Sequence, residues 1–205
     1  MKAFAPTIIV LAAGKSARMG SRNKLLLKIG DETIIERVVR TTVDTRIGDV
    51  IVVVGSDGDR VEEVLKKLRV RVIHNADHEQ GMASSIQAGV RTAGRPRAGF
   101  GICLGDMPDV QPSTFERLAD ALQENPRSIV IPVYGGADGH PVFFGPRFYD
   151  SLLRLDGDAG GRGLIDRNAD AVLRIPVDDP GILKDVDTDE DFSRYRASRL
   201  GESGR

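Results

Sequence analysis

The sequence predicts an α/β protein with three layers, α/β/α, in which helices cover both faces of a doubly wound, mostly parallel sheet of the Rossmann-like type. Two observations predict this fold. Short apolar runs rich in β-branched residues recur along the chain, and such continuous runs are typical of parallel strands buried on both faces. Segments with apolar residues at helical spacing lie between these runs, and strands that alternate with helices form βαβ units.

Five apolar runs are the predicted strands. The first run is interpreted as a strand rather than as part of a signal peptide, because a glycine and several basic residues follow it. In chain order the predicted strands are Thr7–Leu11, Val50–Val54, Val70–Ile73, Gly101–Leu104 and Ile129–Val133.

Helical spacing is clearest in the segments that follow the first two strands. In Thr33–Val43, and again after the second strand, apolar residues share one side of a helix. These residues are Ile34, Ile35, Val38 and Val39 in the first helix, and Val61, Val64, Leu65 and Leu68 in the second.

Two further helices carry polar residues at their predicted starts. Ser113–Leu122 opens with STFE, a capping-box pattern in which Ser113 and Glu116 satisfy each other's backbone amides. The segment GMASSIQAGV forms a helix that Ser84 or Ser85 caps.

The composition fits one soluble domain and argues against several classes of protein. The chain has 205 residues, 40% of them hydrophobic, and a net charge of -1, whereas a general nucleic-acid coat needs a broad basic face. No apolar stretch reaches the roughly 20 residues needed to cross a bilayer. Cys103, the single cysteine, is predicted to fill the core of a cytoplasmic protein. We therefore expect neither nucleic acid nor a membrane as a partner.

The loop after the first strand, GKSARMGSRNK, fits neither of the two best-known phosphate-binding templates. It lacks the G-x-G-x-x-G spacing of a dinucleotide-binding loop, and Met19 stands where a Walker loop needs its second glycine. Arg18 and Lys24 can nevertheless reach a polyphosphate, helped by backbone N–H groups. The alternative is a solvated basic loop between a strand and a helix.

Two more clusters follow predicted strands. Asp106 in GDMP lies just past a buried strand, where a carboxylate is costly unless it meets a cation or hydrogen-bond donors. It is a candidate magnesium ligand, the alternative being an Asx-type turn before Pro108. Gly81 and the serines of GMASS could close on a base and ribose, or serve only as a helix cap. Ligands bind outside the carboxyl ends of the strands in such sheets, so we expect these clusters to converge with the opening loop.

The less regular second half offers candidates for binding an acceptor. They are His140 in GHPV, and Asp158 and Arg162 in LDGDAGGRG. His140 could contact an acceptor phosphate or could simply pack against its neighbours. Asp158 and Arg162 could belong to a loop that binds the acceptor or could merely form a turn.

Asp187 in DVDTDEDF precedes a predicted helix that Thr188 and Asp191 cap. Acidic residues at a helix start normally complement the helix dipole, and this explains the carboxylates after Thr188. Asp187 lies outside that explanation and could supply a second metal ligand.

Six motifs in this order resemble the MobA-like NTP transferases, and among them most closely the molybdenum cofactor cytidylyltransferases. The motifs are LAAGKSARMG…K, QGMASSIQAG, LGDMP, GHPVFF, GDAGGRG and DVDTDED, and the resemblance covers Ile8 to Phe192. It implies a nucleotidyltransferase fold and an enzyme that joins a nucleoside triphosphate to a small phosphorylated acceptor and releases pyrophosphate. The cytidylyl branch has L-A-A-G where guanylyl relatives tend to have a second glycine, so Ala13 favours CTP.

The resemblance also implies roles for individual residues. Catalytic roles fall to Arg18, Lys24 and Asp106, and Mg²⁺ is held by Asp106 and Asp187. His140, Asp158 and Arg162 face the acceptor, molybdopterin or its molybdenum-bound form. Nucleotide-binding roles fall to Leu11, Ala12, Ala13, Gly14, Arg18, Lys24, Gly81, Met82, Ser84 and Ser85.

The chain length predicts one domain over residues 1–198, before a polar tail at 199–205. The alternation of strands and helices loosens after about Ala137, which predicts a nucleotide half of about residues 1–136 and an acceptor half of about 137–198. The resemblance also implies transient contact with proteins that mature molybdoenzymes.

Two departures from the family pattern bear on the acceptor. Asp189 replaces the proline of the usual D-T-P-E-D, and Asp138 stands before GHPV where relatives often carry basic residues. A carboxylate at that position fits poorly with a phosphate-bearing pterin. The alternatives are therefore a transferase for another small phosphorylated acceptor, and a non-catalytic carrier of a pterin cofactor.

Overall fold

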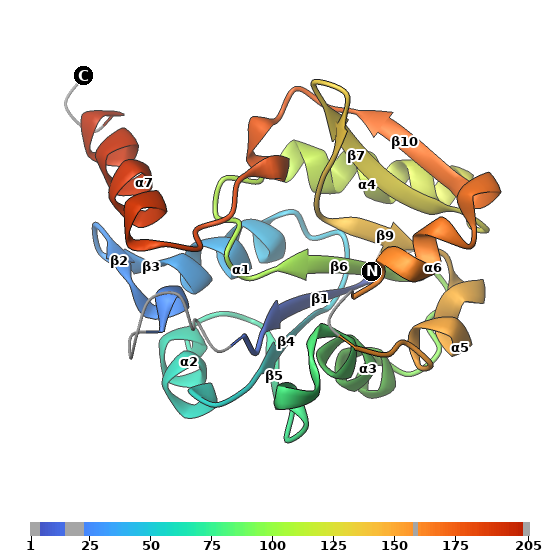
Figure 1. The fold of residues 1–205 in the computed structure, drawn as a ribbon, viewed down its shortest axis with the longest axis horizontal. Helices are drawn as coiled ribbons and strands as arrows, with labels where there is room; N and C mark the ends of the chain where they lie inside the picture. The colour runs from blue at the N-terminus through green and yellow to red at the C-terminus, as the bar shows by residue number, and fades with distance from the viewer. Residues whose placement is uncertain (1–4, 15–22, 158–159, 203–205) are drawn as a thin grey trace.

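The computed structural model describes residues 5–14, 23–157 and 160–202. Within these residues, eight strands form one sheet in the order β10-β7-β9-β6-β1-β4-β5, and β8 pairs with β7 (Figure 1). The strands are β1 (Thr7–Ala12), β4 (Val50–Val54), β5 (Arg71–His74), β6 (Phe100–Leu104), β7 (Ile129–Tyr134), β8 (Ala137–Asp138), β9 (Val142–Phe144) and β10 (Val172–Pro176). A separate pair consists of β2 (Lys28–Ile29) and β3 (Glu32–Thr33).

The sheet is parallel from β6 through β1 and β4 to β5, and β10 pairs parallel with β7. The exceptions are β9, which runs antiparallel between β6 and β7, and the short β8. The prediction of a mostly parallel sheet is confirmed. Each predicted strand is present, with ends that differ by at most one residue.

Seven α-helices are described: α1 (Ile34–Asp44), α2 (Gly58–Leu65), α3 (Met82–Ala93), α4 (Pro112–Glu124), α5 (Tyr149–Leu152), α6 (Arg162–Asp166) and α7 (Asp189–Glu202). α7 projects from the body of the molecule and crosses the predicted boundary at residue 198 (Figure 1). None of the described helices is long and apolar enough to span a bilayer.

Helices pack on both faces of the sheet, because alternate strand residues point to opposite sides. On β1, Ile8 and Val10 pack in one buried cluster with α1, α2 and α4. Ile9 packs in a second cluster with α3, α5 and α6. The two clusters make the three-layer arrangement, and Cys103 lies buried in the first, as predicted.

Two predicted helix starts are wrong. α3 begins at Met82 with Gly81 as its N-cap, so Ser84 and Ser85 fall inside the first turn instead of capping it. α4 begins at Pro112 without the predicted capping box of Ser113 and Glu116.

Of two other predictions about the helices, the one for α2 is wrong at its end and the one for α7 is confirmed. α2 ends at Leu65, so Leu68 is not part of its apolar stripe but still packs against the core. The predicted cap of α7 is confirmed, because Thr188 N donates to Asp191 Oδ2 and Asp191 N donates to Thr188 Oγ1.

A buried carboxylate from a distant segment replaces the predicted cap of α4. Asp179 is 2% exposed, and its Oδ2 accepts hydrogen bonds from Gln111 N at 2.9 Å and Thr114 Oγ1 at 2.7 Å. Its Oδ1 accepts from Gly181 N at 2.9 Å. One side chain therefore holds the start of α4 and the turn before the predicted metal-binding segment.

We expect Asp179→Ala to lower the free energy of unfolding by on the order of 3 kcal/mol, because it leaves several donors buried without an acceptor. Urea unfolding followed by circular dichroism measures this change. The exposed neighbour Asp178 provides the control, and equal stability loss in Asp178→Ala would contradict the role given to Asp179.

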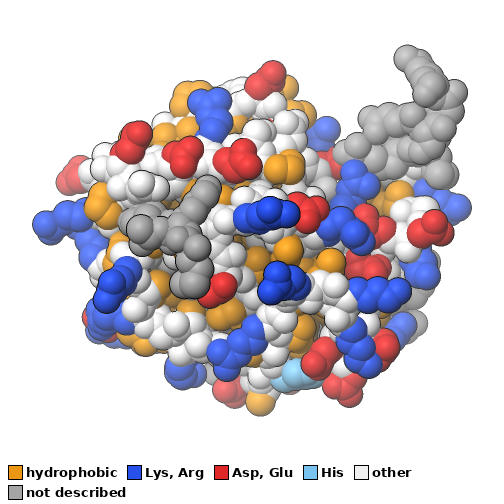
Figure 2. Space-filling view, turned by 180° about the vertical axis from the view of Figure 1, so that it is seen from behind, with side chains coloured by type: hydrophobic (Ala, Val, Ile, Leu, Met, Phe, Trp, Pro, Cys, Tyr) orange, Lys and Arg blue, Asp and Glu red, His pale blue; other side chains and the backbone are white. Residues whose placement is uncertain are grey.

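The surface in Figure 2 carries Lys and Arg side chains interspersed with Asp and Glu side chains. This face therefore lacks the continuous basic surface that a general nucleic-acid coat would need.

Candidate active site

Three segments that are far apart in the sequence meet beyond the carboxyl ends of the strands. They are a short 3-10 helix with Lys24, the turn after β6 with Asp106, and the segment before α7 with Asp187. Lys24 Nζ lies 2.6 Å from Asp106 Oδ2 and 2.5 Å from Asp187 Oδ1. The three side chains predicted to handle phosphate and metal thus form one ion-pair cluster.

Local hydrogen bonding directs Lys24 into this cluster. The buried Asn23 precedes the 3-10 helix Lys24–Leu26, and its side chain accepts a hydrogen bond from Leu25 N at 3.0 Å. Leu25 is 4% exposed and anchors the turn in the core. The cap and the anchor together set the direction in which the Lys24 side chain leaves the backbone.

The turn after β6 is held against β1 by a close backbone approach. Gly105 N donates to Leu11 O at 2.9 Å, and a Cβ atom at Gly105 would lie 2.8 Å from that same oxygen. The glycine therefore permits the contact that places Asp106 at the end of β1. Val186 N donates to Asp106 O at 2.9 Å, which brings the segment with Asp187 alongside.

A third carboxylate belongs to this cluster and was missing from the sequence-based prediction. Ligand oxygens of Asp106, Asp185 and Asp187 all lie within 4.8 Å of one another. The signal in the sequence was the D-V-D spacing, since residues i and i+2 of an extended segment face the same way. Val186 between them is 3% exposed and points into the core.

The charges of the cluster shift the pKa values of its members. Burial alone would lower the pKa of Lys24, but the charge of Asp106 and hydrogen bonds to Asp106 and Asp187 outweigh it and raise the pKa. The pKa of the Asp185 carboxyl is raised by desolvation and then by the negative charges of Asp187 and Asp106. The lysine is therefore firmly cationic, and the carboxylates repel one another.

The donor set fits a hard divalent cation. Mg²⁺ and Mn²⁺ prefer carboxylate oxygens, and three carboxylates converge here. Asp106 Oδ1 is buried and accepts no hydrogen bond from any described residue. A buried carboxylate oxygen without a donor is costly, and a metal ligand at this atom would remove that cost.

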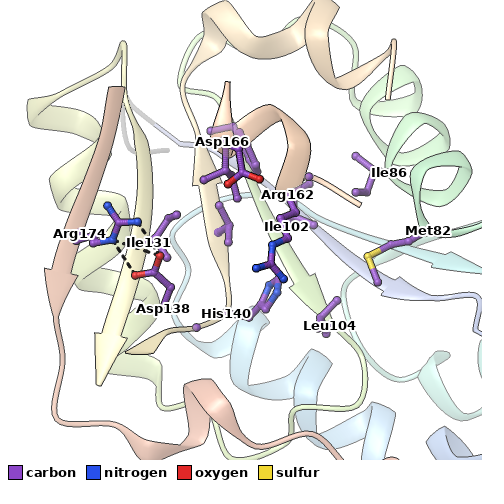
Figure 3. Close-up of a pocket in the computed structure, with 15 residues that line it drawn as sticks. Met82, Ile86, Ile102, Leu104, Ile131, Asp138, His140, Arg162, Asp166 and Arg174 are labelled. Atoms are coloured by element: carbon purple, nitrogen blue, oxygen red, sulfur yellow. Dashed lines mark hydrogen bonds and ion pairs between the residues drawn. The ribbon is translucent and has the colours of Figure 1, made fainter. Parts of the chain in front are cut away.

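A pocket of about 600 Å³ is drawn in Figure 3, and its His140 lies close enough to Asp106 for the charge of that carboxylate to act on it. Its walls come from α3, β6, β7, β8, β9, α6 and β10, and most of its lining side chains are apolar. The apolar ones are Met82, Ile86, Ile102, Leu104, Ile131, Val142, Phe144 and Ile165.

The pocket also contains two of the residues predicted to bind an acceptor, His140 and Arg162, which point into it (Figure 3). Burial lowers the pKa of His140, although the charge of Asp106 and a backbone hydrogen bond to Ile102 act in the opposite direction. The imidazole is therefore neutral near pH 7. Arg162 is exposed, and its side chain makes no hydrogen bond or ion pair with the residues that the structure describes.

Asp138, whose charge disfavours a phosphorylated acceptor, is neutralised on the pocket wall. Arg174 on β10 holds it in a two-pronged ion pair, with Nε 2.9 Å from Oδ1 and one terminal nitrogen 2.9 Å from Oδ2 (Figure 3). Arg174 was absent from the predicted site because its partner lies 36 residues away in the sequence. Arg162 is therefore the cation of this wall that is left to meet an anionic ligand.

Apart from Lys24, the described residues predicted to bind the nucleotide lie at the end of β1 or at the start of α3. Ala12 and Ala13 are 4% and 7% exposed, Leu11 is partly buried, and Gly14 is exposed. The predicted residues Arg18 and Asp158 lie outside the described residues.

The loop between β5 and α3 is held by one buried amide. Asn75 Nδ2 donates to Ser84 Oγ at 2.9 Å and to Ser85 Oγ at 3.1 Å. Gly81 has φ of 99°, a conformation that favours glycine, and Met82 is 40% exposed at the pocket. Ser85, which is 4% exposed, therefore has a hydrogen-bond partner within the protein.

Comparison with known proteins identifies the family. Residues 8–178 match the MobA-like NTP transferase domain. The chain belongs to the MobA-like NTP transferase family. A relative of this NTP transferase, the molybdenum cofactor cytidylyltransferase of Escherichia coli (strain K12), is 25% identical over 189 residues, or 90% of this chain and 92% of that protein.

Two other relatives widen the comparison. The nicotine blue oxidoreductase of Paenarthrobacter nicotinovorans is 28% identical over 196 residues, or 92% of this chain and 95% of that protein. The crystal structure of Rv0371c from Mycobacterium tuberculosis H37Rv has a TM-score of 0.83 at 29% identity and covers 96% of this chain and 100% of its own. A complex of Rv0371c with manganese has a TM-score of 0.80 at 28% identity, covering 95% and 99% of the two chains.

Proposed function

We propose that this NTP transferase moves CMP from CTP to the phosphate of molybdopterin, with Mg²⁺ as cofactor and pyrophosphate as the second product. The observation that carries the proposal is the meeting of Lys24, Asp106 and Asp187 beside the apolar pocket. A phosphate-binding lysine and metal-binding carboxylates are what phosphoryl chemistry needs. The E. coli relative named as a molybdenum cofactor cytidylyltransferase supports the choice of acceptor.

The reaction is an in-line displacement at the α-phosphorus of CTP. An oxygen of the acceptor phosphate forms the new P–O bond, and the bond to the β-phosphate breaks, so pyrophosphate leaves with its electron pair. A phosphate monoester is largely ionised near neutral pH, so no strong general base is required. This agrees with a neutral His140, which can orient a phosphate by hydrogen bonding.

In this proposal Lys24 neutralises charge on the triphosphate, and Asp106 with Asp187 and Asp185 would hold the metal. A bound divalent cation would neutralise negative charge that develops on the phosphate oxygens. The manganese complex of Rv0371c supports a divalent cation in this family. Catalysis rests on alignment and charge neutralisation.

The apolar pocket would take the body of the acceptor and Arg162 its phosphate. The pairing of Asp138 with Arg174 supports an anionic acceptor, because it removes the net charge that Asp138 would otherwise bring. The L-A-A-G motif with Ala13 supports CTP as the donor. We place the reaction in the cytoplasm, where the lone buried thiol of Cys103 stays reduced.

We expect Arg162→Ala to raise the KM for the acceptor by about 10- to 100-fold and to leave the KM for CTP unchanged, because one charge-assisted contact is lost. Steady-state pyrophosphate release with each substrate varied measures both constants. Arg167→Ala removes an exposed arginine at the end of α6 that does not line the pocket. An equal change in both variants would contradict the assignment of Arg162.

A pyrophosphate-release assay with the four nucleoside triphosphates and Mg²⁺, with and without molybdopterin, tests the whole proposal. We expect release only with CTP and molybdopterin together. Release with another phosphorylated acceptor would keep the transferase and change its substrate, whereas tight cofactor binding without release would indicate a carrier.

One relative favours a second candidate function. The nicotine blue oxidoreductase matches 92% of this chain, so a redox reaction on a small organic molecule in the apolar pocket is the rival. Such a reaction gives no role to the three carboxylates around Lys24. Oxidation of a reduced nicotinamide cofactor without pyrophosphate release would favour it.

A further inference from the structure

We propose that Lys24 occupies the position of the divalent cation, so that metal binding and the present Lys24 contacts exclude each other. The metal would release Lys24 to the triphosphate, and loading of the site would therefore be ordered. This inference rests on the metal site of the proposed function and adds a rule about how that site is filled.

The distances carry the argument. Lys24 Nζ lies 2.6 Å from Asp106 Oδ2 and 2.5 Å from Asp187 Oδ1. A bound Mg²⁺ sits about 2.0–2.1 Å from each carboxylate oxygen, so an ion that bridges Asp106 Oδ2 and Asp187 Oδ1 would need the space that the Lys24 ammonium now fills. Ligand oxygens within 4.8 Å of one another, here including Asp185, match the roughly 4 Å that separates opposite ligands of one such ion.

Electrostatic repulsion disfavours both cations between the same carboxylates, and repulsion among the carboxylates favours the presence of one cation there. A divalent ion and an ammonium about 3 Å apart in a partly buried site repel strongly. Without either cation, three carboxylates would face one another at short range. Lys24 is 12% exposed and serves as the counter-ion.

Lys24 can leave without moving the fold. Its ammonium stands at the end of a flexible four-carbon stem, whereas Asn23 and Leu25 anchor the backbone on either side. Rotation of the stem would carry the charge from the carboxylates to a phosphate oxygen. Metal binding would then raise the affinity for the triphosphate.

The test is titration of the full-length protein with Mn²⁺ alone, with free Mn²⁺ followed by its electron paramagnetic resonance signal. We expect Lys24→Gln to bind Mn²⁺ at least about 10-fold more tightly than the unmodified protein, because the metal no longer displaces two charge-assisted hydrogen bonds. Unchanged or weaker Mn²⁺ binding in Lys24→Gln would overturn the inference.

Arg37→Gln controls for the loss of positive charge alone. Arg37 Nε donates to Pro108 O at 3.3 Å, close to the cluster but without contact to its carboxylates. We expect this variant to tighten Mn²⁺ binding by less than about three-fold, since solvent and salt screen a charge at that distance. Equal tightening in both variants would mean that net charge, and not occupancy, sets the affinity, and would overturn the inference.

A second measurement uses the unmodified protein, so it does not depend on whether a variant of the cluster folds. Detection of lysine side-chain ammonium groups by nitrogen-15 NMR follows Lys24 while Mg²⁺ is added, and we expect its ion-pair resonance to disappear as the site fills. An unchanged resonance at saturating Mg²⁺ would overturn the inference.

Asp106→Asn distinguishes failure of the ordered loading from failure of the proposed metal site. If Mn²⁺ binding depends on Asp106 but not on Lys24, the ordered loading fails and the proposed function stands. If Asp106→Asn binds Mn²⁺ as tightly as the unmodified protein, the metal site of the proposed function fails, and the inference fails with it.

Discussion

Asp106→Asn is expected to lower turnover by about 100- to 1,000-fold, the loss typical of removing one charge contact from a transition state. Asp106 combines the two features that a metal ligand needs here, an ion pair to Lys24 through Oδ2 and a buried Oδ1 without a hydrogen-bond donor among the described residues. Asparagine keeps the shape and removes the charge. Pyrophosphate release under single-turnover conditions measures the effect.

The matched control for this variant is Asp189→Asn. Asp189 lies in the first turn of α7, two residues after Asp187, and is not part of the three-carboxylate cluster. We expect its turnover to stay within about two- to three-fold of the unmodified protein. Turnover near the unmodified level in Asp106→Asn, with an unchanged circular dichroism spectrum, would remove Asp106 from the mechanism.

Lys24→Ala is expected to lower turnover by a similar factor, about 100- to 1,000-fold, because the triphosphate loses its point-charge contact. The loss should occur although the divalent cation binds more tightly, since the ammonium no longer competes for Asp106 and Asp187. Loss of turnover together with gain of metal affinity distinguishes this variant from one that damages the metal site.

Lys28→Ala provides the control for Lys24→Ala. Lys28 is exposed on β2, four residues along the chain, and its loss removes the same charge from the same region. Both variants are assayed for pyrophosphate release at saturating CTP and metal. Equal turnover in the two variants would show that Lys24 is not needed for the reaction.

The fold was predictable because its signals are local. Continuous runs such as Val50–Val54 are buried on every residue, and the apolar face of α1 follows the 3.6-residue period of its own sequence. The prediction of the start of α4 was wrong because the hydrogen-bond partner of that start is distant in the sequence. The start of α4 depends on Asp179, which lies 68 residues after Gln111, and no pattern around Ser113 contains that information.

The site was predictable in part for a related reason. Polar residues just past strand ends are visible in the sequence, and in a parallel sheet these ends share one edge. Asp106 and Lys24 were found in this way. Asp185 was missed because its role depends on the extended conformation and the buried Val186 beside it, and the pairing of Asp138 with Arg174 depends on the order of β8, β7 and β10.

The sequence by itself determined the alternation of strands and helices, the family, and the residue types that phosphate and metal chemistry require. Only the tertiary structure decided which of them meet. Lys24 reaches Asp106 across 82 residues and Asp187 across 163, and such contacts depend on strand order and on backbone contacts such as that between Val186 and Asp106. Local periodicity carries no information about those distances, so the cluster and the competition within it follow from the folded chain.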